Sequence, residues 1–116
     1  MQIRVSTNSS VQGGEELSRK VEDTVGNALL LYADRIMGVE VHLSDENADK
    51  GGASDKRCTI EARITGQHPV AVTHHGSSLE EACGGAAHKM SHLIGHKLGR
   101  LDKHKGNTSM GGAEDI

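Results

Sequence analysis

The residues best suited to chemistry are cationic and imidazole side chains near the C-terminal end of the sequence. Between residues 88 and 105 they fill the positions left by an apolar helical pattern, as His88, Lys89, His92, His96, Lys97, Arg100, Lys103, His104 and Lys105. This stretch has five Lys and Arg against one acidic residue, a net charge of +4, whereas residues 1–87 have eight against thirteen, a net of −5. A basic helix face on an acidic body is suited to binding RNA phosphates, an acidic protein or an anionic membrane.

Three histidines in this stretch have the spacing of possible metal ligands. His88, His92 and His96 recur every four residues, which places them along one face of a helix. An i, i+4 pair of imidazoles can bind a transition metal. The pattern contains no carboxylate or cysteine that would complete a closed site, so adventitious binding is favoured and we predict no dedicated metal site and no cofactor. In the other interpretation, the histidines are weakly basic members of the cationic face.

Other polar motifs fail on detail. The segment 45–51 resembles a calcium loop, but Lys50 and Lys56 stand where an EF-hand requires Gly and a bidentate Glu. The glycine pairs at 13–14 and 51–52 are not followed by the GK[ST] of a phosphate-binding loop. No nucleophile–base pair or pair of catalytic carboxylates can be argued from spacing. The sequence therefore predicts a protein that is not an enzyme and has no small-molecule substrate.

Cysteine usage and hydropathy bear on the cellular compartment. Cys58 and Cys83 are the only cysteines, and without a CxxC motif they are predicted to be reduced, buried thiols. No run approaches the roughly 18 apolar residues of a membrane-spanning helix. The opening segment, residues 1–6, alternates like a strand and has no signal-peptide pattern. We therefore expect a cytoplasmic protein that does not act at a membrane.

Hydrophobic periodicity predicts strands over residues 2–7, 39–44, 57–64 and 70–75, and helices over residues 15–34 and 78–105. Each strand alternates, so one sheet face is apolar and both helices should cover it. This predicts an α+β two-layer sandwich of order β-α-β-β-β-α with a four-stranded sheet. Ile60 and Leu93 are expected to be buried between the layers. Residues 1–105 form the domain, and residues 106–116 are predicted to be a flexible tail.

Several short motifs occur in an order that is specific as a whole. They are Met1-Gln2-Ile3, Asp34-Arg35-Ile36 ahead of Val39-Glu40-Val41-His42-Leu43, Asp55-Lys56-Arg57-Cys58, Leu79-Glu80-Glu81-Ala82 and the closing Leu101-Asp102-Lys103-His104-Lys105. With these motifs, residues 1–105 resemble the short hibernation-promoting factor and ribosome-associated inhibitor proteins, whose domain is also called sigma-54 modulation. The resemblance implies the same fold as the periodicity does.

The resemblance also implies a function. Such proteins bind in the channel of the small ribosomal subunit where mRNA and tRNA sit, and they block translation in stressed or stationary cells. Their basic residues on both helices, chiefly the second, contact rRNA. The matching positions here are Arg19, Lys20, Lys89, His92, His96, Lys97, Arg100 and Lys103. The implied partners are the small ribosomal subunit and its rRNA, and the oligomeric state stays open.

Two features depart from the resemblance. His92 and His96 stand where Arg or Lys is usual, and the whole chain has a net charge of −3. Both weaken the attraction to rRNA at neutral pH. They favour an alternative, in which the chain is a stress-associated protein-interaction module of the same fold with weak or lost rRNA binding.

Overall fold

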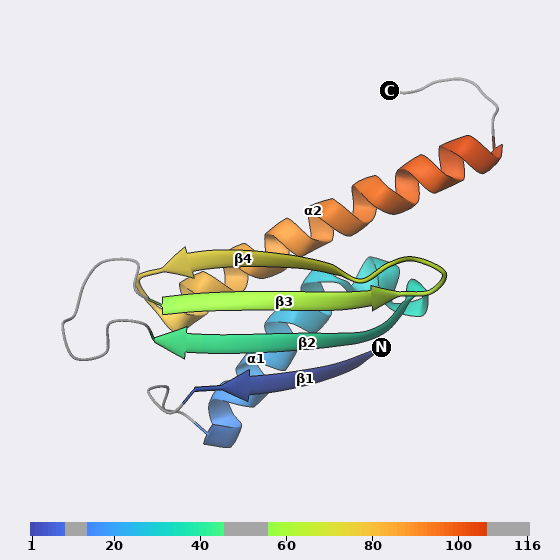
Figure 1. The fold of residues 1–116 in the computed structure, drawn as a ribbon. Coiled ribbons are helices and arrows are strands. Elements are labelled where there is room, and N and C mark those ends of the chain that lie inside the picture. The colour runs from blue at the N-terminus through green and yellow to red at the C-terminus, as the bar shows by residue number, and fades with distance from the viewer. Residues whose placement is uncertain (9–13, 46–55, 107–116) are drawn as a thin grey trace.

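Four strands form one sheet, and two helices pack on it (Figure 1). The computed structural model describes residues 1–8, 14–45 and 56–106, and for residues 100–106 it describes the backbone alone. The elements, in chain order, are β1 (Gln2–Thr7), α1 (Gly14–Ala28), the 3-10 helix η1 (Leu30–Arg35), β2 (Ile36–Asp45), β3 (Lys56–Ile64), β4 (Val70–Gly76) and α2 (Leu79–Gly106).

The strands lie in the order β1-β2-β3-β4. β1 pairs with β2 in parallel, because the chain crosses over through α1 and η1 between them, and the other two pairings are antiparallel. The β3–β4 connection turns at Gly66, where φ is 76°, a left-handed value that glycine adopts without a steric penalty. The N–H of Gln67 closes this turn on the carbonyl of Ile64 at 3.0 Å.

Both helices lie on the same face of the sheet, behind it in Figure 1, as the alternating strands predicted. The core is aliphatic because its members come from the apolar phase of β2 and β3 and the inner sides of α1 and α2. They include Val21, Val25, Val39, Val41, Leu43, Ile60, Ile64, Ala86, Met90 and Ile94, all buried. The predicted two-layer α+β sandwich is therefore confirmed. Within the described residues, no helix is long and apolar enough to span a membrane.

The helix predicted over residues 15–34 is divided in two. α1 ends at Ala28, and residues 30–35 form the 3-10 helix η1. The buried Leu29 anchors the junction, and its carbonyl accepts the N–H of Tyr32 at 2.9 Å. The tighter turns bring the chain back to the sheet, and they leave Leu30 and Leu31 exposed at 69% and 81%.

β2 begins at Ile36, three residues before the predicted start. Ile36 and Val39 are an odd number of residues apart, so they cannot share a face of a regular strand, and the alternating pattern therefore places the start at Val39. The pairing with β3 shifts register between Ile36 and Gly38, which is a bulge. The extra residue restores the phase, so that Ile36 and Val39 are both buried while Met37 is 63% exposed.

Two predicted loops fall mainly outside the described residues. The polar loop with the calcium-like motif corresponds to residues 46–55, between β2 and β3. The predicted tail corresponds to residues 107–116, and Gly106 is the last residue of α2.

The burial of Ile60 was predicted correctly, whereas that of Leu93 was only partly correct. Ile60 is fully buried in the centre of β3, while Leu93 is half-buried at the margin of the α2 contact. We expect Ile60→Ala to lower the free energy of unfolding by about 2–5 kcal/mol and Leu93→Ala by clearly less, because a partly exposed side chain leaves a smaller cavity. Urea unfolding of both variants checks the order, and equal losses would contradict it.

Two adjacent glycines of α2 meet different surroundings. A Cβ placed on Gly85 would collide with the imidazole of His74, whereas a Cβ on Gly84 would meet nothing within 4 Å. We expect Gly84→Ala to stabilise the protein by about 1 kcal/mol, the helix preference of Ala over Gly. Gly85→Ala should destabilise it, because His74 must leave its place under α2. Comparing the Tm of the two variants separates the effect of packing at residue 85 from the helix preference of Ala, which both variants share. A stabilising Gly85→Ala would refute the close contact.

Candidate nucleic-acid interface

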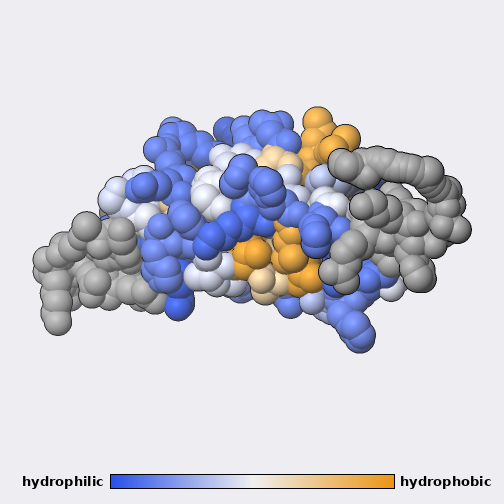
Figure 2. Space-filling view, turned by 90° about the horizontal axis from the view of Figure 1, so that it is seen from above, coloured by the Kyte–Doolittle hydropathy of each residue, from blue (hydrophilic) through white to orange (hydrophobic). Residues whose placement is uncertain are grey.

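The outward face of α2 presents the predicted cationic and imidazole side chains. Apolar and small residues of the helix face the sheet, with Cys83, Ala86, Met90, Ile94 and Leu98 buried. His88, Lys89, His92 and His96 are exposed on the other side, and Lys97 is half-buried between the two. From above in Figure 2, hydrophilic side chains cover most of the described surface, with smaller hydrophobic areas between them. The helix is therefore amphipathic as predicted.

The start of α2 is fixed by reciprocal hydrogen bonds. The hydroxyl of Ser78 accepts the N–H of Glu81 at 3.0 Å, which is half of a capping box. The Glu81 carboxylate reaches one residue further back than a capping box requires. It accepts the N–H of Ser77 at 2.8 Å and the hydroxyl of Ser77 at 2.7 Å. These bonds set the direction in which the cationic face projects.

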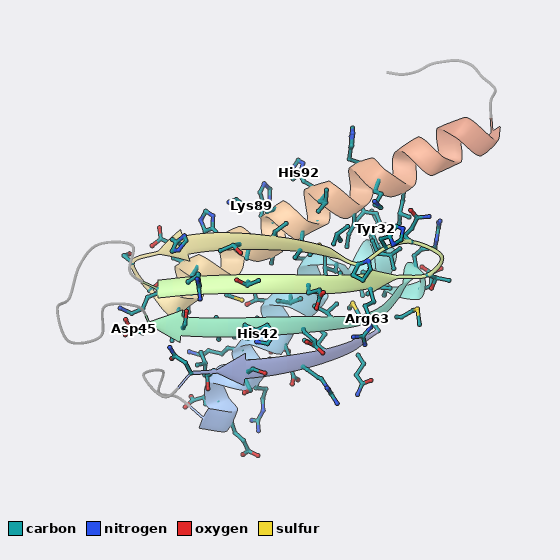
Figure 3. All side chains as sticks on the ribbon, in the orientation of Figure 1. Tyr32, His42, Asp45, Arg63, Lys89 and His92 are labelled. Atoms are coloured by element: carbon teal, nitrogen blue, oxygen red, sulfur yellow. The ribbon has the colours of Figure 1, made fainter. Side chains whose placement is uncertain are left out.

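Lys89 makes an intramolecular bond. Its ammonium donates to the carbonyl oxygen of Thr73 at 3.0 Å, across the gap between α2 and the edge strand β4. Figure 3 shows Lys89 and His92 on the same side of α2. The charge of Lys89 therefore lies close to the sheet edge, and binding to a phosphate would require it to leave Thr73 or share its protons.

The two predicted cations of α1 lie at the other end of the interface. Lys20 forms an ion pair with Glu80 of α2, 3.4 Å from ammonium to carboxylate, with both side chains exposed. Arg19 is exposed on the same helix. Glu80 and Lys97 are 17 residues apart along α2, which corresponds to about 25 Å. The structure thus does not gather the eight predicted residues into one cluster.

Arg100 and Lys103 belong to the last turns of α2, and only their backbone is described. In Figure 1 this end of α2 projects beyond the strands. The backbone that carries Arg100 and Lys103 therefore lies in the part of α2 that extends past the sheet, whereas Lys97 is half-buried before it.

The open face of the sheet contains an ion-pair network that sequence reasoning missed. The Glu40 carboxylate lies 3.9 Å from the guanidinium of Arg4 and 3.8 Å from that of Arg63, and 3.7 Å from the Nε2 of His42. His42 and Arg63 are labelled in Figure 3. Each of these residues is on the polar face of its strand, but only the pairing register of β1, β2 and β3 places them next to one another. Glu40 offsets the charge of its neighbours on this face.

The two cysteines are buried and free, as predicted. Cys58 on β3 and Cys83 on α2 lie against each other in the core. The pKa of the Cys58 thiol is raised well above its ordinary value. The largest cause is a hydrogen bond with Cys83, and the next is burial. Cys58 is therefore held in the thiol form, and a buried thiol of this kind packs as a small apolar side chain.

The histidine stripe has a definite geometry at one end. The rings of His88 and His92 are 4.6 Å apart between centroids, in an edge-to-face arrangement with 64° between planes. In the part of the chain that the structure describes, no group of three or more His, Cys, Asp or Glu side chains is arranged to hold a metal ion.

Several solved structures share this fold, and two of them illustrate the match. The N-terminal domain of Protein Y from Thermus thermophilus matches with a TM-score of 0.67 and 18% sequence identity, over 84% of this chain and 99% of that one. A ribosomal subunit interface protein from Coxiella burnetii matches with a TM-score of 0.69 and 12% identity, over 85% of this chain and 99% of that one. No family model matches the sequence, and no curated protein matches it. The comparison establishes a shared fold at low identity.

The stability contributed by Glu81 at the start of α2 depends on pH. Hydrogen bonds from the hydroxyl and then the N–H of Ser77 lower the pKa of its carboxyl from the ordinary value of 4.5. A lowered folded-state pKa stabilises the protein above the unfolded value, and this stabilisation is lost as the pH falls through the folded value. We expect Glu81→Gln to reduce the fall in Tm on acidification below about pH 4.5. Glu22→Gln, on the exposed side of α1, is the control and should leave the acid-induced fall as it is in the parent.

Proposed function

We propose that this chain is a ribosome-associated factor of the hibernation type, which binds rRNA of the small subunit through the outer face of α2 and thereby inhibits translation. The observation that carries the proposal is an exposed cationic helix face on the fold of a ribosomal subunit interface protein. The sequence motifs described above support the same family. On this proposal the protein is cytoplasmic, acts without catalysis and has the ribosome as its partner.

The composition favours contacts to phosphates over contacts to bases. Tyr32 is the only aromatic residue, and it is half-buried on η1 near Gly95 of α2, where its hydroxyl occupies the space of a missing side chain. The open sheet face therefore has no Phe, Tyr or Trp ring on which single-stranded bases could stack. Recognition would depend on the shape of folded RNA and on its backbone charge, which cationic side chains contact without reading sequence.

The eight candidate residues should contribute unequally. Lys20 and Lys89 have protein partners at 3.4 Å and 3.0 Å, so binding to RNA would exchange one interaction for another. Lys97 lies where α2 begins to leave the sheet, and Arg100 and Lys103 follow it along the helix. We assign the largest contributions to these three, the intermediate ones to His92 and His96, and a peripheral one to Arg19.

A second candidate function is favoured by the charge of the chain. With a net charge of −3, the body of the protein repels RNA beyond the immediate contacts. A stress-associated protein-interaction module of the same fold would tolerate this charge. The two functions differ in what the α2 cations bind, and so they differ in their response to salt and to a loss of charge.

We expect binding to isolated small subunits to weaken as salt rises, with a log–log slope of roughly 0.7–0.9 per phosphate contact. The triple variant Lys97→Gln, Arg100→Gln, Lys103→Gln should lose most of the binding and give a shallower slope. Co-sedimentation over a salt series measures both quantities. A thermal melt of the triple variant verifies that the fold is retained.

The matched control removes the same charge from other surfaces. The variant Arg4→Gln, Arg35→Gln, Arg63→Gln lowers the net charge by three and changes no residue of α2. It should retain most of the binding. If both triple variants bind as the parent does, the α2 face is the wrong assignment. If the parent does not co-sediment with ribosomes at any salt concentration, the protein-interaction module becomes the better account.

A further inference from the structure

We propose that His88 and His92 form a binding site for a divalent transition cation, and that the bound cation strengthens the attachment of the α2 face to RNA. The first half depends only on the structure of the free protein. The second half rests on the proposed function, since it assigns a role to the cation at that same surface.

The distance between the two rings is the first support. When two imidazoles bind one cation at bond angles between 90° and 110°, their ring centres lie roughly 4.5–5.2 Å apart, given a metal–nitrogen distance of about 2.0–2.1 Å. The centroids of His88 and His92 are already 4.6 Å apart. Both side chains are exposed, so a rotation that directs one nitrogen of each ring to a common point meets no core packing. The helix backbone places the two residues one turn apart on the same face.

The position of Lys89 is the second support. A lysine between two imidazoles in sequence would ordinarily repel a cation bound to them. Here Lys89 lies on the same side of α2 as His92 (Figure 3), but its ammonium donates to the carbonyl of Thr73 at 3.0 Å and is held at the edge of β4. That bond keeps the charge from turning freely toward the imidazoles.

The ligand set determines which cations fit. Imidazole nitrogens suit Zn²⁺, Ni²⁺ and Cu²⁺, whereas Mg²⁺ and Ca²⁺ prefer oxygen ligands. Among the described residues no third side chain completes a closed site. Two protein ligands leave coordination positions for water or for the oxygens of an RNA phosphate. The site is therefore open, and its outward positions point in the same direction as the cationic face.

A bound cation would change the charge of the α2 face. A neutral imidazole adds no charge to the α2 face, and the whole chain has a net negative charge. A divalent cation held by two neutral imidazoles adds two positive charges to the face, and it does so where a phosphate can also become its ligand. Metal and RNA would then each raise the affinity of the other by the same factor, because coupled binding is reciprocal.

His96 provides an alternative pair with His92. Residues 88 and 96 are two turns apart, about 12 Å along the axis, and cannot share one cation. His92 belongs to either pair, which makes it the decisive position. The ring geometry favours the pair with His88.

The first experiment uses the full chain without RNA and titrates it with ZnCl2 or NiCl2 in a calorimeter. The parent should bind one cation per chain, and its Tm should rise with metal concentration. His92→Gln should abolish the binding, and His88→Gln should weaken it more than His96→Gln does. His68→Gln, in the exposed turn before β4, is the control and should bind as the parent does. No binding by the parent, or equal binding by parent and His92→Gln, would overturn the site.

The second experiment measures binding to small subunits with ZnCl2 and with a chelator. Affinity of the parent should rise with metal by roughly 5–150-fold, the usual range for coupled sites. The affinity of His92→Gln should be the same in both conditions. Equal parental affinity with and without metal would overturn the coupling. A parent that binds no subunits in either condition would contradict the proposed function and also the coupling, while the titration of the free protein still decides the site.

Discussion

The close contact between α2 and the sheet is the interaction on which the rest of the structure depends. Small residues make it possible. Ala82, Ala86 and Ala87 face the strands, and Gly85 leaves room for the imidazole of His74. Larger side chains here would lift the helix and open the core below it, because interiors are packed to near-crystalline density. The absence of Phe and Trp fits this arrangement, since a thin aliphatic layer needs a short distance between helix and sheet.

The same contact explains why α2 can serve as a binding surface. Its N-terminal half is held by caps, by the sheet and by the ion pair with α1, so its direction is fixed. The helix stays packed on the core through Ile94 and Leu98, and its backbone then continues beyond the strands (Figure 1). The packed part sets the direction in which the projecting end leaves the sheet.

The layers of the fold and the cationic positions of α2 could be predicted from the sequence. The contacts between elements could not, because they depend on the pairing register and on packing. Alternation in the strands and the spacing of apolar residues in α2 identified the layers because each reports on a single element. The bulge at Met37 could not be predicted, because its signature is an odd spacing that also describes the end of a strand. The bonds of Lys20 and Lys89 join elements far apart in sequence, and no local pattern encodes them. The sequence therefore identified the cations but not which of them have partners.

The bond from Lys89 to Thr73 has a consequence for self-association. β4 is an edge strand, and its outward carbonyls are the groups through which a second sheet would add by strand pairing. A positive charge fastened to one of them occupies an acceptor and places a long charged side chain across the approach path. Strand addition at this edge would have to displace that bond, so pairing at β4 is less favourable than it would be at an unguarded edge.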